Sequence, residues 1–559
     1  MVKIKVDLEK VFLILFFVIL LFIGPGILFG HKIMHDFPFG YGASDAFQHQ
    51  VRAEAIKGAG NFKYEAFYIS KGIENVEGRY PPVLYHLAVN LSYVSGMETY
   101  DSIYFIVVFF EIIAAFTMYF VIRIFNKSVA ILAMPLSLLV FSFPVSLGIL
   151  WGHWPSILSQ FFIVLLIWSI ARMELNKSFM LIALSLSATA LVHTSETIFA
   201  LIFLALFFGV KLLMKKLDKS DIKNIVLSLT LFSIISFYYL VIFLNTWAKG
   251  QPYTFAVQPI WEGNPGFYIA GFGLLLIPII AGIAFSFPNL KNINVPFIAA
   301  YAMLISGFLN YAGFEVRSFQ IRFLWPIYLS VFFGFGLYIL IKPIAKKWNP
   351  IYAYILAIVF IVLISGIVKL PILKQTGNQI IPWVPKINSA ASQGIMDPYH
   401  WDALRWVSEN TPEKSKIYFF YGDIYSQDAL LRNSKRIHYQ ADPESFIKDL
   451  QDRKIKRDYI SEMPGDTGGG VTVRTSFFKF ENPFVNMPKE EHFGPQDICR
   501  FDYLVVDKVS RQPVLAQYNM LIASELAKKD YISKVFENEV VFILKNDNVG
   551  ADCIEERSF

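Results

Sequence analysis

The chain has 559 residues, of which 55% are apolar, 16% aromatic and only 17% charged. Ordinary soluble domains carry about 25% charged residues and a smaller apolar share, so this composition excludes a disordered chain, a nucleic-acid-binding domain and a simple soluble enzyme. The two cysteines exclude a disulfide-rich scaffold and a cysteine-based zinc module, and the net charge of +6 does not in itself indicate a polyanionic partner. The length leaves room for many membrane spans and one further soluble domain.

Eleven apolar stretches qualify, or nearly qualify, as membrane-spanning helices, which need about 20 mostly apolar residues. In chain order they lie at 11–30, 102–122, 128–149, 155–172, 178–193, 197–213, 224–245, 265–287, 294–311, 322–341 and 351–370. The first stretch follows basic residues, as in a signal peptide, but no small-residue cleavage pattern comes after it and ten more stretches do. We therefore interpret it as a retained anchor.

Basic residues distinguish the two sides of this predicted multi-pass membrane domain. With the N-terminus inside, the N-terminal segment and the inner turns together carry 16 Lys and Arg residues, whereas the short outer turns carry only Lys249 and Arg317, with Arg322 at the start of the next span. Because cytoplasmic loops are enriched in Lys and Arg, this asymmetry predicts eleven crossings of a cell membrane, a cytoplasmic N-terminus and an extracytoplasmic C-terminus.

One further apolar segment, YPPVLYHLAVNLSYVSG (80–96), does not fit the same count. If it crossed the membrane, Arg123, Lys127 and the five-lysine loop 211–223 would lie outside, against the charge rule. We therefore interpret it as a helix that begins after Pro81-Pro82 and lies at, or dips into, the outer interface.

The predicted fold is mainly α: a polytopic helical bundle followed by an extracytoplasmic α/β domain. Residues 1–375 form the membrane domain, including a long first outer loop (31–101), residues 376–396 a proline-containing linker, and residues 397–559 the outer domain. In that domain we expect helices at 397–410 and 513–529 and strands at 416–422, 501–508 and 540–546.

Two features of the outer domain leave alternatives open. The basic cluster RKIKR (453–457) is either a solvated face or a contact for lipid headgroups. Cys499 and Cys553 both lie in this region, where an oxidising exterior permits a disulfide.

Polar residues gather in the first outer loop, GYGASDAFQHQVRAEAIKGAGNF (40–62). We expect a helix capped by Ser44 or Asp45. Asp45, His49 and Arg52 stand at i, i+4 and i+7, so one helix face presents a carboxylate, an imidazole and a guanidinium. Placing charged and imidazole groups near hydrocarbon costs free energy, so their presence here indicates a functional role.

DAFQHQVRAEAI (45–56) followed by YPPVLYHL (80–87) resembles the GT-C class of integral-membrane glycosyltransferases, which includes oligosaccharyltransferases, protein O-mannosyltransferases and aminoarabinose transferases. The shared layout is a first span, an acidic residue at the start of a long outer loop, and in several families a Pro-Pro helix before the next span. Asp45 takes the place of the acidic residue. The chain lacks a clear Asp-x-Asp pair, since Asp36 and Asp45 are nine apart, and lacks a WWDYG-type motif, so a protein-asparagine acceptor is not implied.

The resemblance implies a sugar donor linked to a polyprenyl phosphate, such as dolichyl or undecaprenyl phosphate, and a reaction at the outer face with a lipid, glycan, polymer or protein acceptor. Transfer to a hydroxyl needs a carboxylate that takes or orients the acceptor proton, and Asp45 is the candidate base. It also needs cations or a metal beside the departing phosphate. Arg317 and Arg322 are candidates for that phosphate because guanidinium groups match its oxygens.

Further candidate substrate-binding residues lie in or near the predicted outer turns: His49, Arg52, Tyr80, His153, Trp154, His193 and Glu196. Asp45 and His49 could share a divalent cation, Mg²⁺ or Mn²⁺, although two ligands do not make a site. The ordinary alternatives stay open: Asp45 as a helix cap, Trp154 as part of an aromatic belt, the two arginines as snorkelling residues, and Arg52 paired with Glu54 or the tail. Glu111, in mid-span, has no partner that the sequence identifies.

Three functions are consistent with these features. The first is a membrane glycosyltransferase that uses a polyprenyl-phosphate-linked donor. The second is a polytopic transporter or lipid flippase, although no duplicated halves are visible and the polar groups gather outside rather than at the midplane. The third is a non-catalytic membrane scaffold whose tail binds surface polymers, in which case Trp401, Trp406 and Tyr439 would matter more than Asp45.

Overall fold

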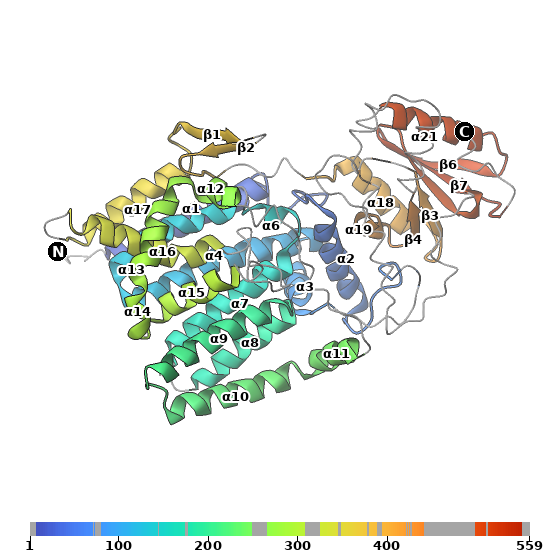
Figure 1. Cartoon of the computed structure of the whole chain (residues 1–559). Coiled ribbons are helices and arrows are strands. Elements are labelled where there is room, and N and C mark those ends of the chain that lie inside the picture. The colour runs from blue at the N-terminus through green and yellow to red at the C-terminus, as the bar shows by residue number, and fades with distance from the viewer. Residues whose placement is uncertain are drawn as a thin grey trace, which may run out of the picture. The chain divides into compact units, whose positions relative to one another are not determined.

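The computed structural model shown in Figure 1 describes residues 7–70, 72, 80–142, 145–173, 177–248, 265–307, 325–344, 348–376, 379–387, 394–420, 422, 424, 428–440, 498–509 and 513–550. The chain forms two compact units. The helical unit comprises Met1–Ile33, Arg79–Leu87 and Ile103–Ser392, and the mixed unit comprises Met34–Gly78, Ala88–Ser102 and Gln393–Phe559. Most of the first outer loop thus belongs to the mixed unit, whereas the sequence grouped it with the membrane domain; the domain boundaries stay a prediction.

Among the described residues, five helical segments are long and apolar enough to cross a membrane: α1 (Leu8–Leu28), α4 (Thr99–Phe125), α7 (Trp154–Ala171), α9 (Glu196–Leu213) and Ile269–Ser286. The last of these begins in α12 (Pro265–Phe272) and continues through η2 (Gly273–Leu275) and α13 (Leu276–Ser286). Shorter apolar helices are α5 with η1 (Lys127–Ala133, Met134–Phe141), α8 (Ser178–Val192), α15 (Val295–Gly307), α16 (Trp325–Ile341) and α17 (Ile351–Ile364). The remaining helices are α6 (Leu147–Leu150), α10 (Lys219–Ile235), α11 (Phe237–Ala248) and α14 (Pro288–Lys291).

The predicted apolar stretches therefore coincide with helices, several of which are interrupted. The break between α12 and α13 has a local cause: Gly273 has a positive φ of 52°, and a Cβ there would lie 2.3 Å from the carbonyl oxygen of Trp383. The next residue, Leu274, donates its backbone N–H to that same carbonyl at 2.7 Å. The length and apolar composition of these helices identify the chain as a membrane protein. The number of crossings, eleven, and the side of the membrane on which each terminus lies remain predictions.

A buried carboxylate ties the first helix to its neighbours. Glu9 of α1 accepts a hydrogen bond from the Tyr119 hydroxyl at 2.5 Å, pairs with Lys127 at 2.7 Å and also pairs with Arg123. Arg123 and Lys127, which the sequence used only to assign sidedness, thus also join α1, α4 and α5 through one acidic residue.

The mixed unit contains a five-stranded sheet with strand order β4-β3-β5-β7-β6. Its strands are β3 (Lys416–Phe419), β4 (Ile437–Gln440), β5 (Tyr503–Asp507), β6 (Ile532–Glu537) and β7 (Val541–Asn546). β3 pairs in parallel with both β4 and β5, whereas β7 runs antiparallel to β5 and β6. Helices α18 (Pro398–Asn410), α19 (Asp428–Leu431) and α21 (Pro513–Leu526) accompany the sheet (Figure 1).

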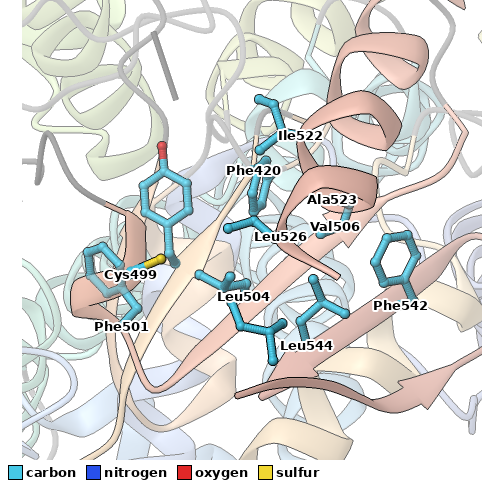
Figure 2. Packing of buried hydrophobic residues seen from close by; sticks show 12 residues of the cluster. Phe420, Cys499, Phe501, Leu504, Val506, Ile522, Ala523, Leu526, Phe542 and Leu544 are labelled. Carbon is cyan, nitrogen blue, oxygen red and sulfur yellow. The ribbon is translucent and has the colours of Figure 1, made fainter. Parts of the chain in front are cut away.

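The core of this domain lies between α21 and the sheet. Figure 2 shows Leu504 and Val506 of β5 facing Ile522 and Leu526 of α21, with the other members of the cluster around them. Successive side chains of a strand point to opposite faces, so Asp507 lies on the other face, where it contacts α18 through His400. Both faces of β5 are covered, and every residue of the strand is buried.

Strands β3, β5 and β7 and helices α18 and α21 lie where the sequence predicted them. β4 and β6 were not predicted: β4 has the mixed sequence IHYQ, and β6 is an edge strand with one fully buried residue out of six and two charges. The predicted linker begins in a hairpin of β1 (Ile372–Thr376) and β2 (Gln379–Pro382). Cys499 is buried and disulfide-bonded; Cys553 and the basic cluster 453–457 lie outside the described residues.

Candidate functional site

The predicted helix of the first outer loop is α2 (Ser44–Ala59). Its N-cap is Ala43, so the prediction that Ser44 or Asp45 caps it is wrong. Asp45 instead lies in the first turn, where free backbone N–H groups and the helix dipole stabilise a carboxylate. The helix ends at Gly60, whose φ of 68° allows its N–H to bond to the Ile56 carbonyl at 2.8 Å.

One face of α2 carries the three predicted polar residues on consecutive turns. Asp45 and Arg52 are half-buried, and His49 is only 5% exposed. Gln48, at i+3 from Asp45, shares this face and is 4% exposed, but the sequence interpretation did not include it. The i, i+3, i+4, i+7 spacing would have identified it, because these positions lie one above another on a helix.

Arg52 pairs with Glu65, not with Glu54 as one alternative predicted. Its Nε and Nη2 atoms lie 3.2 and 3.0 Å from Glu65 Oε1. The pair fastens the chain after α2 back onto the helix, where Tyr68 and Ile69 pack on Val51. At least one role of Arg52 is therefore structural, and its place in substrate binding remains a proposal.

Glu54 binds two groups of the same unit that are distant in sequence. Lys435 Nζ lies 3.0 Å from its Oε1 atom, and the Thr99 hydroxyl donates to Oε2 at 2.5 Å. Burial alone would raise the pKa of Glu54, but the Lys435 charge and the hydrogen bonds of Thr99 and Lys435 outweigh it and lower the pKa. Glu54 is therefore ionised at neutral pH and joins α2 to the chain before β4.

In the helical unit, the turns around 153 and 193 come together. His193 Nδ1 lies 3.4 Å from Ser156 Oγ and 3.6 Å from Glu196 Oε1. Gln160 donates its side-chain N–H to Glu196 Oε2 at 3.2 Å, and Glu196 is 3% exposed. The sequence identified His193 and Glu196 but not Ser156 and Gln160, which lie one turn apart on α7.

Trp154 belongs to the packed interior, not to an exposed aromatic belt. It is fully buried, its ring centroid lies 5.7 Å from that of Tyr104, and its Nε1–H donates to the Ile149 carbonyl at 2.7 Å. His153, half-buried, forms the N-cap of α7. The belt alternative for Trp154 is therefore wrong.

The other candidates are placed as follows. Tyr80 is half-buried and precedes the buried Pro81-Pro82 pair, after which α3 (Val83–Ser95) begins. Arg317 and Arg322 lie outside the described residues. Glu111 is 1% exposed, and neither carboxylate oxygen has a hydrogen-bond partner within the described part of the chain.

The described residues do not assemble a metal site. Among them, no group of three or more His, Cys, Asp and Glu side chains is placed to hold an ion. No third ligand from the described residues joins Asp45 and His49 to form a metal site. We therefore assign no chemical step to a metal.

The chain combines a bundle of apolar helices, a helix with a polar face after the first of them and a C-terminal α/β domain, and it shares its fold with solved membrane glycosyltransferases of the GT-C class. No protein-family model and no curated sequence matches it. The apo oligosaccharyltransferase of Archaeoglobus fulgidus is similar, with a TM-score of 0.53 over 92% of this chain and 73% of that one, at 13% identity.

Two further solved structures are similar to the chain. Oligosaccharyltransferase AglB of Archaeoglobus fulgidus, in complex with an inhibitory peptide and a dolichol-phosphate, has a TM-score of 0.51 over 94% of this chain and 73% of that one, at 14% identity. ArnT of Cupriavidus metallidurans, bound to undecaprenyl phosphate, has a TM-score of 0.46 over 96% of this chain and 98% of that one, at 10% identity. At these identities the likeness to the two Archaeoglobus fulgidus structures establishes the fold alone.

Proposed function

We propose that this protein is a membrane glycosyltransferase that moves a sugar from a polyprenyl-phosphate-linked donor to a lipid, polymer or protein acceptor at the outer face of the membrane. The observation that carries the proposal is the GT-C fold together with Asp45 in the first turn of the helix after the first apolar helix. The dolichol-phosphate in the AglB complex supports the donor class, because that protein shares the fold.

The proposed reaction assigns Asp45 as general base. An acceptor oxygen attacks the anomeric carbon, the bond from that carbon to the phosphate oxygen breaks, and the phosphate leaves with the electron pair. The acceptor proton passes to the Asp45 carboxylate. Asp45 is suited to this role because it is half-exposed, so that an acceptor reaches it, and because the helix N-terminus favours its ionised form.

The other residues of the proposal have binding roles. His49 and Arg52 lie on the Asp45 face of α2 and are proposed to contact the donor. Arg317 and Arg322 are proposed to hold the lipid phosphate, as guanidinium groups do well. Tyr80, His153, His193 and Glu196 are also proposed to contact the substrate, whereas the fully buried Trp154 is assigned to packing. The N-terminus is proposed to be cytoplasmic and the C-terminal tail extracytoplasmic, as the charge asymmetry predicts.

The decisive experiment compares Asp45→Asn with the wild type, purified in detergent, using dolichyl- and undecaprenyl-phosphate-linked sugars. We expect kcat to fall by a factor of about 100 or more, the usual contribution of a positioned base. Asp530→Asn, which makes the same change in an exposed turn, is the matched control and should leave turnover unchanged. Unchanged turnover by Asp45→Asn would remove Asp45 from the mechanism.

A further inference from the structure

The face of α2 that carries Asp45 has a buried polar group that the proposed mechanism does not use. Gln48 is 4% exposed, and its side-chain Nε2 has no hydrogen-bond partner within the described residues. A buried donor without a partner loses its hydrogen bond to water and gains none in return, so protein interiors rarely retain one without a use for it.

Helix geometry places this donor beside the Asp45 carboxylate. Each residue turns an α-helix by about 100°, so Gln48 lies about 60° around the axis from Asp45 and less than one turn further along. Side chains on a helix lean toward its N-terminus, and the Gln48 amide therefore leans over the turn that bears Asp45. Because Asp45 is half-exposed, a ligand can reach this end of the polar face.

We infer that Gln48 is a substrate-binding residue whose amide N–H donates to an oxygen of the polyprenyl-phosphate-linked sugar, at its phosphate or at a sugar hydroxyl, beside Asp45. The inference rests on the proposed function. Without substrate the donor has no partner among the described residues; with substrate it gains one. Gln48 therefore lowers the stability of the free protein and raises its affinity for the donor substrate.

Gln50 provides a matched control. It is 2% exposed, and its Oε1 has no partner within the described residues. It lies about 140° around α2 from Asp45, on another face. Gln48→Met and Gln50→Met make the same change of shape and polarity in the same helix, but only the first alters the Asp45 face.

The experiment measures turnover, KM and the thermal unfolding midpoint of full-length protein in detergent, alone and with undecaprenyl or dolichyl phosphate. For Gln48→Met we expect an unchanged or higher midpoint, a decrease in kcat/KM of about ten-fold or more, and a smaller midpoint rise on adding ligand. Gln50→Met should show the same unchanged or higher midpoint with unchanged turnover.

The ligand series separates the two oxygens. If the lipid phosphate alone raises the unfolding midpoint of the wild type but not that of Gln48→Met, the contact is with the phosphate. If the midpoint rise is lost in Gln48→Met only with the complete sugar donor, the contact is with the sugar. Two results overturn the inference: full turnover and full ligand response in Gln48→Met, or a lowered midpoint, which would mean that Gln48 has an internal partner. Failure of the wild type with every sugar donor would instead overturn the proposed function, while the lipid-phosphate response still tests Gln48.

Discussion

The ammonium of Lys435 lies 3.0 Å from the Glu54 carboxylate, although 381 positions separate the two residues in the chain. Thr99 completes the arrangement by donating to the other oxygen of Glu54. Glu54, on the helix that carries Asp45, is thereby bound to Lys435, two positions before β4. The ion pair therefore helps to hold α2 in place within the mixed unit.

Replacing Lys435 by Met should destabilise the protein modestly, because Glu54 keeps its burial but loses its cation. We expect a loss of about 1 kcal/mol, since the Lys435 side chain is 39% exposed and solvent screens the pair. The pKa of Glu54 is lowered, so its contribution is present above the ordinary Glu pKa and is lost as the pH falls.

The measurement for Lys435 is the unfolding midpoint at pH 7 and pH 4.5. The midpoint difference between the wild type and Lys435→Met should be larger at pH 7. Lys416→Met, at an exposed lysine of β3, controls for the loss of one positive charge and should behave as the wild type. Equal effects of the two substitutions would show that the ion pair contributes nothing.

A buried histidine predicts a dependence of stability on alkaline pH. His400 Nδ1 lies 2.5 Å from Asp397 Oδ2, and its Nε2 lies 3.2 Å from Asp507 Oδ2. Burial alone would lower the pKa of His400, but the hydrogen bonds and charges of the two carboxylates raise it to about 9. Because the folded-state pKa is raised, the stabilisation is complete below pH about 6.5 and is lost as the pH rises through about 9.

The unfolding midpoint followed from pH 6 to pH 10 tests this prediction. The wild type should lose on the order of 2 kcal/mol across that window, and His400→Gln should show a flatter profile from a lower starting value. Asp397→Asn keeps the N-cap of α18, since Asn caps as well as Asp, but removes one charge, so it should reduce the alkaline loss. A profile that is the same in all three proteins would contradict the assignment.

Local signals in the sequence were sufficient for much of the fold. Apolar runs located the helices of the bundle, and the i, i+4, i+7 spacing located the polar face of α2. β5 and β7 were predicted because a strand buried on both faces has a nearly continuous apolar run, LVV in β5 and VFIL in β7. β6 lacks that signal, since only one of its six residues is fully buried.

Partners that are distant in sequence could not be predicted. The charges of Arg52, Glu54 and Glu65 allow several pairings, and only tertiary packing selects Arg52 with Glu65 and Glu54 with Lys435. Hydropathy also does not distinguish a helix face that contacts lipid from one that contacts another helix, because both are apolar. For this reason the sequence left an aromatic-belt position open for Trp154, which is in fact fully buried.

Trp154 should behave as a core residue under mutation. Trp154→Ala removes a fully buried ring and leaves a cavity beside Tyr104, which we expect to cost about 3 kcal/mol. Trp154→Phe keeps the ring contact but loses the hydrogen bond to the Ile149 carbonyl, which should cost about 1 kcal/mol.

The unfolding midpoint and the turnover, measured together, separate packing from sugar binding for Trp154. Packing predicts that the midpoint falls in the order wild type, Phe variant, Ala variant, and that turnover per folded molecule is affected less than the midpoint. A midpoint that stays constant while Trp154→Ala loses turnover would instead assign the ring to substrate contact.

The packing of α13 on α16 depends on two glycines placed reciprocally. A Cβ at Gly282 would lie 1.9 Å from the Phe332 carbonyl oxygen, and a Cβ at Gly336 would lie 1.9 Å from the Pro278 carbonyl oxygen. Each of these contacts is with backbone, which cannot move aside as a flexible side chain can. Small residues allow such close approach between apolar helices, and that contact stabilises a bundle in lipid.

Gly282→Ala and Gly336→Ala should each therefore push the two helices apart and destabilise the protein by about 1–3 kcal/mol, the usual cost of overpacking. Gly209→Ala is the control: a Cβ there has nothing within 4 Å, and replacing a glycine inside α9 should stabilise that helix by up to about 1 kcal/mol. The unfolding midpoint should thus fall for Gly282→Ala and Gly336→Ala and stay the same or rise for Gly209→Ala.

The double variant Gly282→Ala/Gly336→Ala tests whether the two contacts are coupled. Because one displacement of α13 from α16 relieves both clashes, its loss of stability should be smaller than the sum of the losses of the single variants. Strictly additive losses would show that the two contacts are relieved independently.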